Sequence, residues 1–289
     1  MTEPSQAASQ HSLTWRLTLA YDGTDFYGWQ IQPGVQTIQG ELQSALGRIV
    51  GESPLPQGSG RTDAGVHALA QVASFQLQAR IPPPNLLRAL NRTLPQSIRV
   101  LGAETVESTF HARHSAVAKT YEYRVLPIEP ACHQICPPFL ARYVYPFSWP
   151  LDFITLNGAA TSFLGEHDFR SFAASEPDLA TRAENTAEDS RIQTMRTAKR
   201  SIYSSSWSQQ TTDGFNLLIY RVRGNGFLHH MVRNLVGTML DVARGYMHLH
   251  DIPAILAAQD RALAGPTAPA RGLFLQSVEY NLETDNSVF

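Results

Sequence analysis

The chain has 289 residues, of which 43% are hydrophobic, enough for a packed core in one large or two smaller domains. The formal net charge is −2, so the overall charge does not mark a nucleic-acid-binding protein, and any such surface must be local. The sequence lacks a run of about 18 apolar residues, which excludes a membrane-spanning helix. Two cysteines are too few for a disulfide scaffold and favour a reducing, cytoplasmic setting.

The first half of the chain is expected to alternate strands and helices. Apolar and polar residues alternate over Leu13–Tyr21, which predicts a half-buried strand. Thr37 has the character of an N-cap and Gly51 that of a C′ residue, so they predict the two ends of a helix. The other elements expected here are a strand ending at Phe75, a short helix after Pro82–Pro84 and a strand over Ser97–Val106.

The second half, from about Ala116, repeats this order of elements without a repeat in sequence. The expected strands are Lys119–Leu126, a hairpin of Ser201–Gln209 with Asn216–Val222, and Leu273–Tyr280. The expected helices are Leu151–Leu164, Phe227–Arg244 as the longest, and Asp251–Leu263. Hairpin signals rather than long crossovers predict an α+β fold, with two units side by side that share a largely antiparallel β-sheet flanked by helices.

These patterns divide the chain into segments. We expect a disordered tail at 1–12, whose polar composition lacks a signal-peptide core, and a flexible tail at 283–289. Between them we expect an N-terminal half at 13–115 and a C-terminal half at 116–282. Ser175–Arg200 is polar and lacks apolar periodicity, which predicts a mobile loop. A solvated loop and an RNA-clamping lid are both compatible with its composition.

A glycine-rich stretch, Gln57–His67, precedes the first half's strand ending at Phe75 and carries Arg61 and Asp63. Glycines permit positive φ and close backbone approach, and charged residues ahead of a rigid strand are typical of a site on a scaffold. The alternative is a turn in which Asp63 bonds the backbone near Gly65. Taken alone, these residues favour the turn.

Two further side chains have both a structural and a functional interpretation. On the helical wheel Arg233 falls at the edge of an apolar arc, where it needs an acceptor or a route to water. Tyr121 and Tyr123 share one face of a strand, where tyrosines pack in cores or stack on unpaired bases.

Metal binding is not expected. His229 and His230 would point about 100° apart on a helix and so rarely share an ion. Cys132, His133 and Cys136 offer fewer ligands than a structural zinc site needs.

Six segments in order carry a resemblance to a known family: Tyr21–Gly23 with Gly28–Gln30, Gly60–His67, Phe110–Arg113, Lys119–Tyr123, Asn225–Asn234 and Gly272–Leu275. On these, the chain from Leu13 to Tyr280 closely resembles the bacterial tRNA pseudouridine synthase A family. The resemblance implies isomerisation of uridine to pseudouridine at positions 38, 39 and 40 of the tRNA anticodon arm, without metal or organic cofactor. It also implies a homodimer built from two ferredoxin-like halves, with the active site in the cleft between them.

The same resemblance assigns roles to residues. Asp63 is similar to the catalytic nucleophile, Arg61 to the arginine that displaces the target nucleotide, and Tyr121 to the tyrosine that stacks on the flipped uracil. Arg233 matches the arginine that pairs with the catalytic aspartate. Further candidate RNA contacts are His67, Arg196 and Arg200.

Two other functions are alternatives to this one. A non-catalytic tRNA-binding protein on the same fold would not need Asp63, Tyr121 and Arg233 together. An aspartate-dependent glycosidase or nucleosidase would need a second carboxylate, which does not accompany Asp63 in its motif.

Overall fold

The computed structural model describes residues 12–128, 135–174, 198–212 and 214–281. Over these ranges the chain is a mixed α+β protein whose strands pair mostly antiparallel, which confirms the fold class expected from the sequence. None of the helices described is long and apolar enough to cross a membrane.

The chain forms two compact units. Unit 1 is built from the described parts of Met1–Ala64, Ala68–Ala116 and Asn281–Phe289, and unit 2 from those of Gly65–His67 and Val117–Tyr280. The short segment Gly65–His67 belongs with unit 2 although it lies within the first half of the sequence. A division of the chain at a single point does not anticipate this.

Unit 1 is organised around strand β1 (Leu13–Tyr21), which pairs antiparallel with β3 (His67–Leu77) and β4 (Ile98–Val106). The short β2 (Gln57–Gly58) pairs with β3. The inward-facing side chains of β1 are Trp15, Leu17, Leu19 and Tyr21, all of them buried. The bounds of β1 confirm the alternation read from the sequence.

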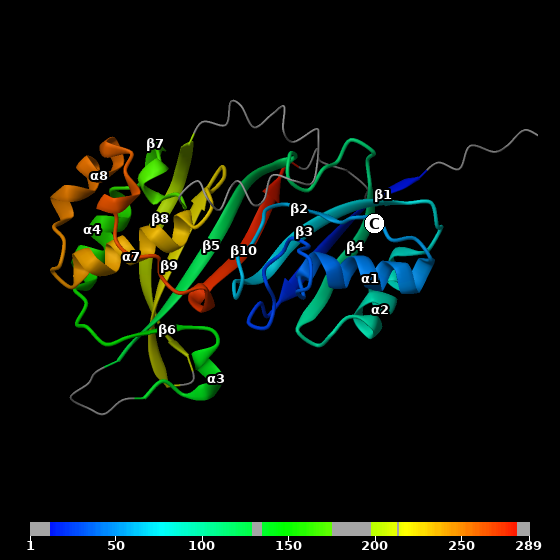
Figure 1. Cartoon of the computed structure of the whole chain (residues 1–289), viewed down its shortest axis with the longest axis horizontal. Helices are drawn as coiled ribbons and strands as arrows, with labels where there is room; N and C mark the ends of the chain where they lie inside the picture. The colour runs from blue at the N-terminus through cyan, green and yellow to red at the C-terminus, as the bar shows by residue number, and fades with distance from the viewer. Residues whose placement is uncertain (1–11, 129–134, 175–197, 213, 282–289) are drawn as a thin grey trace, which may run out of the picture. The chain divides into compact units, whose positions relative to one another are not determined.

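Helices α1 (Ile38–Val50) and α2 (Pro83–Thr93) pack beside each other on unit 1 (Figure 1). The Thr37 side chain accepts a hydrogen bond from Gly40 N and so caps α1, while Gly51, at φ 74°, ends it in the left-handed region. Both predicted ends of this helix are therefore confirmed.

Unit 2 has the strand order β10-β5-β9-β8-β7. Its strands are β5 (Ala116–Pro127), β6 (Tyr145–Phe147), β7 (Gly165–Asp168), β8 (Lys199–Thr212), β9 (Phe215–Gly224) and β10 (Leu273–Tyr280). Strand β9 is antiparallel to both β5 and β8, and β6 runs parallel to β5. The hairpin and the final strand expected from the sequence are present.

The helices of unit 2 are α3 (Pro138–Ala141), α4 (Phe153–Thr161), α7 (Met231–Ala243) and α8 (Ile252–Ala258), with single 3₁₀ turns η2 (Arg170–Phe172), η4 (Leu249–Asp251), η5 (Arg261–Leu263) and η6 (Ala270–Gly272). Helix α4 packs against α7 and β8, and α8 packs against β7 (Figure 1). A separate apolar cluster, Leu126, Leu140, Val144, Leu217 and Ile219, packs α3 against β5 and β9.

Four expectations about helix and loop bounds were wrong. Helix α4 covers Phe153–Thr161 rather than Leu151–Leu164. Helix α7 begins at Met231, not Phe227, because His230 takes a left-handed conformation at φ 59°, and α1 is equally long at 13 residues. Helix α8 ends before Gln259, which is also left-handed. Lys199 and Arg200 belong to β8 rather than to a loop, and the rest of the expected loop from 175 to 197 lies outside the described residues.

Strand β5 carries a charged residue on the face away from its tyrosines. Glu122 is 4% exposed, and its two oxygens accept hydrogen bonds from Arg124 Nε and Arg221 Nε, each at 2.8 Å. Arg221 lies on β9 directly opposite Glu122. A buried carboxylate needs its charge compensated, and the bond from Arg221 also links β9 to β5.

Candidate active site

The loop that carries Asp63 lies against the backbone of residues 28 and 29 in unit 1. Trp29 N donates to Thr62 O at 3.0 Å. Gly28 has φ +83°, and a Cβ placed on it would lie 2.5 Å from Thr62 O. Only glycine lets the two backbones approach this closely. Asp63 is half-buried and Arg61 is exposed.

Buried polar side chains on β1 and β3 hold this loop in place. Gln71, fully buried on β3, donates from Nε2 to Gly60 O at 2.9 Å and accepts from Ser59 Oγ at 2.6 Å. The Tyr21 hydroxyl lies 2.8 Å from Thr62 Oγ1. Burial raises the pKa of Tyr21 to about 12, so its hydroxyl stays protonated at neutral pH. The loop on the N-terminal side of Asp63 is thus held by hydrogen bonds to side chains of two strands, β1 and β3.

Neither Gln71 nor Ser59 was singled out from the sequence. The available signal was a glutamine within the apolar run that follows His67, at a position where the strand's alternation faces the core. A buried amide at such a position must find partners, and here they are groups of the Asp63 loop.

In unit 2, Tyr121 lies on β5 opposite Val222 of β9 and is 8% exposed. Its ring meets that of Phe227 edge-on, with centroids 5.0 Å apart and planes at 80°. This is a favourable aromatic geometry, and it fixes the plane of the tyrosine ring.

Arg233, on the first turn of α7, is half-buried, in keeping with its position at the edge of the apolar arc. Its Nε donates to Ala268 O at 2.7 Å, and Ala268 N donates to Arg233 O at 3.1 Å. Tyr123 holds the same segment, because its hydroxyl donates to Pro269 O at 2.7 Å. Burial raises the pKa of Tyr123, although the charges of Arg233 and Arg271 oppose the shift.

The segment that contacts Arg233 is pressed closely onto α7. A Cβ on Gly237 would lie 1.7 Å from Pro266 O, and one on Gly265 would lie 2.7 Å from Thr238 Cα. Asn234, fully buried, accepts at Oδ1 from Arg261 Nη2 and Thr267 Oγ1 and donates to Phe172 O. The sequence interpretation had not assigned Asn234 a role.

His67 is placed in the core of unit 2. It is 1% exposed, its ring stacks on Phe274 with centroids 4.6 Å apart, and Nε2 lies 3.0 Å from Arg142 O and 3.2 Å from Arg271 O. Two carbonyl partners imply that this nitrogen carries the proton. In this structure the ring ties together parts of unit 2 and offers almost no surface to RNA.

The other candidate RNA contacts lie at or beyond the edge of the described residues. Arg200 is half-buried on β8 and donates to Lys199 O at 2.6 Å. Arg196 lies outside the described residues.

The histidine pair at 229 and 230 precedes α7 instead of belonging to it. The two rings lie 3.9 Å apart. The two side chains therefore do not diverge as expected for neighbours on a helix, and that expectation was wrong. The other candidate ligand group includes Cys132 and His133, which lie outside the described residues, and Cys136, whose thiol pKa is raised by burial.

Comparison with known proteins places the chain in a family. The sequence model of a family described as "tRNA pseudouridine synthase" matches residues 18–115 and 159–281, which is more than half of the chain. The chain belongs to the tRNA pseudouridine synthase A family. It is accordingly an enzyme, an isomerase.

Relatives that carry the name tRNA pseudouridine synthase A match almost end to end. The protein from Solibacter usitatus is 47% identical over 92% of this chain and 98% of its own length. Those from Moorella thermoacetica and Bacillus pumilus are 42% and 41% identical, with the same coverage. The family expected from the sequence motifs is confirmed.

Proposed function

We propose that this enzyme converts uridine to pseudouridine at positions 38, 39 and 40 of the tRNA anticodon arm, with Asp63 as the catalytic nucleophile. The observation that carries the proposal is the support given to the Asp63 loop by Tyr21, Gln71 and Gly28. A surface turn without a catalytic role does not need hydrogen bonds from buried side chains, whereas a nucleophile must be held in place.

An ionised carboxylate is suited to this reaction. An aspartate with an ordinary pKa of about 3.9 is charged at neutral pH and can attack C1′ of the ribose or C6 of the base. The N1–C1′ bond breaks, the uracil turns, and C5 joins C1′. C5 then loses its proton, N1 gains one, and Asp63 is released unchanged, so the reaction needs no co-reactant. We propose that no metal or organic cofactor takes part.

The uridine must leave the RNA helix before Asp63 can reach it, at a cost of a few kcal/mol or so. Arg61, which is exposed, would fill the vacated position. Tyr121, whose ring plane is set by Phe227, would stack on the flipped uracil for about 1–3 kcal/mol.

Arg233 would pair with Asp63 and keep it ionised. Of the five N–H groups of its guanidinium, the one on Nε donates to Ala268 O. The remaining features that the resemblance implies are also proposals: ferredoxin-like halves, a cleft between them that holds the site, a homodimer and a cytoplasmic setting.

The test is a pseudouridine assay at single-nucleotide resolution on unmodified tRNA. Wild type should modify positions 38, 39 and 40, whereas Asp63→Asn should bind tRNA with similar affinity and form no product. Asp260→Asn is the matched control, since Asp260 is an exposed aspartate whose Oδ1 accepts a local hydrogen bond from Ala262 N.

Product formation by Asp63→Asn at the wild-type rate would overturn the nucleophile assignment. A wild-type protein that binds tRNA but modifies no uridine would instead favour the non-catalytic binding protein.

A further inference from the structure

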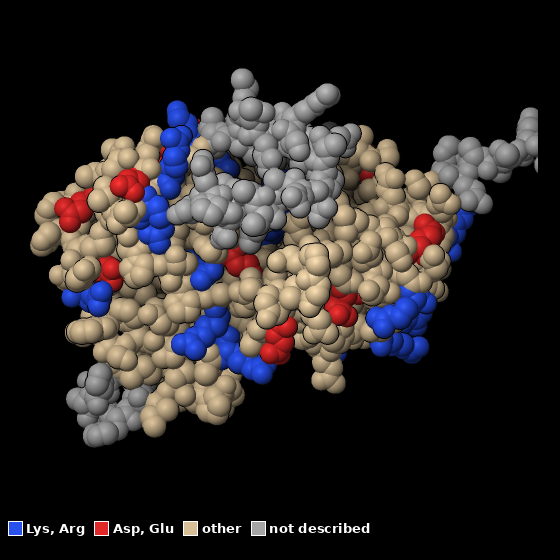
Figure 2. All heavy atoms as spheres, viewed as in Figure 1, with Lys and Arg blue, Asp and Glu red and all other residues tan. Residues whose placement is uncertain are grey.

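Unit 1 has a long stretch of one charge sign. From Ala64 to Ala103 the sequence contains Arg80, Arg88, Arg92 and Arg99 but neither aspartate nor glutamate. The whole chain has a net charge of −2, so the positive charge here is a local feature. Figure 2 shows Lys and Arg side chains gathered over helices α1 and α2 of this unit.

None of these four arginines makes an ion pair within the part of the chain that the structure describes. Arg88 donates from Nη2 to the neutral Asn85 Oδ1 at 2.6 Å, and Arg99 donates to the carbonyls of Pro95 and Ile98. The first acidic residue after this stretch, Glu104, is already paired with Arg16 at 2.7 Å. The surface therefore keeps its positive charge.

Two of the arginines share one face of α2. Arg88 and Arg92 are exposed and four residues apart, a spacing that places their side chains side by side on a helix. Exposed like charges at this spacing destabilise a helix slightly, by a few tenths of a kcal/mol or so. An anionic ligand would remove this repulsion.

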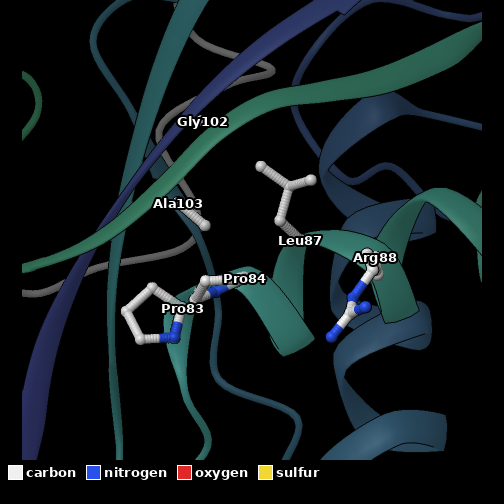
Figure 3. A pocket seen from close by; sticks show the side chains of 6 residues that line it. All are labelled: Pro83, Pro84, Leu87, Arg88, Gly102 and Ala103. Atoms are coloured by element: carbon white, nitrogen blue, oxygen red, sulfur yellow. The ribbon is translucent and has the colours of Figure 1, made fainter.

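A hollow of about 500 Å³ adjoins Arg88 (Figure 3). Its lining is Pro83, Pro84, Leu87 and Arg88 from α2, and Gly102 and Ala103 from β4. Apart from Arg88 these residues carry apolar or no side chains. The hollow and Arg88 together therefore offer an apolar wall beside a cation, a combination that suits a sugar or base attached to a phosphate.

We propose that the α2 surface, defined as Arg88, Arg92 and the hollow, binds the sugar–phosphate backbone of RNA. The identification of that RNA as tRNA rests on the proposed function. Arg88 and Arg92 each contact a phosphate, and the hollow receives the adjoining ribose or an unpaired base. This contact is additional to the nucleotide at Asp63, so it contributes affinity and orientation rather than chemistry.

The test measures binding of unmodified tRNA at several salt concentrations. Removal of one arginine–phosphate interaction lowers the slope of log K against log salt by about one, so Arg88→Gln with Arg92→Gln should lower the slope by about two. The dissociation constant at low salt should rise several-fold, with the rate at saturating tRNA unchanged. Glutamine and arginine have similar helix propensities, so α2 should stay folded.

Two further variants sharpen the comparison. Arg88→Lys with Arg92→Lys retains the charge and should keep the wild-type slope. Arg170→Gln removes an exposed arginine that is already paired with Asp168, and it should leave both the slope and the affinity unchanged.

A double glutamine variant with the slope and affinity of Arg170→Gln would overturn the proposal. So would unchanged tRNA binding together with lost binding to anionic phospholipid vesicles, which would assign the surface to a membrane. Pseudouridine is measured in the same samples. Wild type without product, combined with a lowered slope in the variant, would contradict the proposed function but not the α2 surface.

Discussion

The phenolic oxygen of Tyr21 lies 2.8 Å from Oγ1 of Thr62, the residue immediately before Asp63, and both side chains are buried. The bond links the end of β1 to the loop that presents the proposed nucleophile. Its loss should therefore affect the position of Asp63 as well as the stability of unit 1.

Replacing Tyr21 by phenylalanine tests this link. We expect Tyr21→Phe to lower kcat by tenfold or so while tRNA affinity stays close to wild type, since a displacement of about 1 Å in a site is costly. The free energy of unfolding should fall by about 1 kcal/mol. Single-turnover kinetics and urea unfolding measure the two effects.

Tyr220→Phe is the control for that variant, because Tyr220 is also buried and lies 2.8 Å from a hydroxyl, that of Ser205. It should lose similar stability and keep its rate. Equal rate losses in the two variants would show that the Tyr21 effect is general destabilisation.

Gly28→Ala should damage the Asp63 loop more than an ordinary glycine substitution. Gly34 has a similar φ of +76° with no atom within 4 Å of an added Cβ, so Gly34→Ala should cost only the left-handed penalty of about 1 kcal/mol. Gly28→Ala adds a contact of 2.5 Å with Thr62 O, so we expect a loss above about 2 kcal/mol and little pseudouridine. Matching stabilities and activities would refute the close approach of these backbones.

Gly237→Ala should strongly destabilise unit 2, by about 3 kcal/mol or more, because the added Cβ would meet Pro266 O at 1.7 Å. Gly158→Ala on α4 is the matched helical control, since its Cβ would meet only the flexible end of Leu249 at 3.1 Å. There the helix propensity of alanine, worth about 1 kcal/mol, should offset the crowding. Thermal melting of both variants measures the two losses of stability. A small loss for Gly237→Ala would contradict the close packing of Pro266 on α7.

Stability should fall at alkaline pH. Burial raises the pKa of Tyr21 to about 12 and also raises those of Tyr123 and Tyr220. Because the folded protein retains three protons that unfolded tyrosines lose, this stabilisation is complete below about pH 10 and is lost as the pH rises above it. The loss should approach about 4 kcal/mol per pH unit for the three tyrosines.

Urea unfolding at pH 9 and pH 11 measures that slope. The chain has only two lysines, Lys119 and Lys199, so tyrosines dominate the titration in this range. Tyr220→Phe should reduce the slope by about a third. Phenolate absorbance of these tyrosines rising well before unfolding would contradict the prediction.

Sequence periodicity predicted the regular elements well where local signals were strong. Strands β1 and β10 have the bounds expected, and Thr37 and Gly51 marked both ends of α1. The start of α7 was placed too early because the apolar pattern runs through residues 227–230. His230 takes a left-handed conformation at φ 59°, which the apolar pattern does not reveal.

The family motifs selected the residues proposed for chemistry, but not those that hold them. Gln71 and Asn234 are buried polar side chains whose partners lie far away in sequence or on the main chain. From sequence alone, a glutamine or asparagine is expected to face solvent, because its buried hydrogen-bond partners are not yet known. His67 shows the opposite case, a motif residue that the structure places in the core.

Because side chains alternate between the two faces of β5, the strand is sensitive to the insertion or deletion of a single residue. Tyr121 and Tyr123 face one side, while Glu122, between its two arginines, faces the other. Removing a single residue ahead of Tyr121 would exchange these faces and put a carboxylate where an aromatic ring now packs. Removing two would restore the order. An insertion or deletion in β5 should therefore preserve folding only when it changes the strand by an even number of residues.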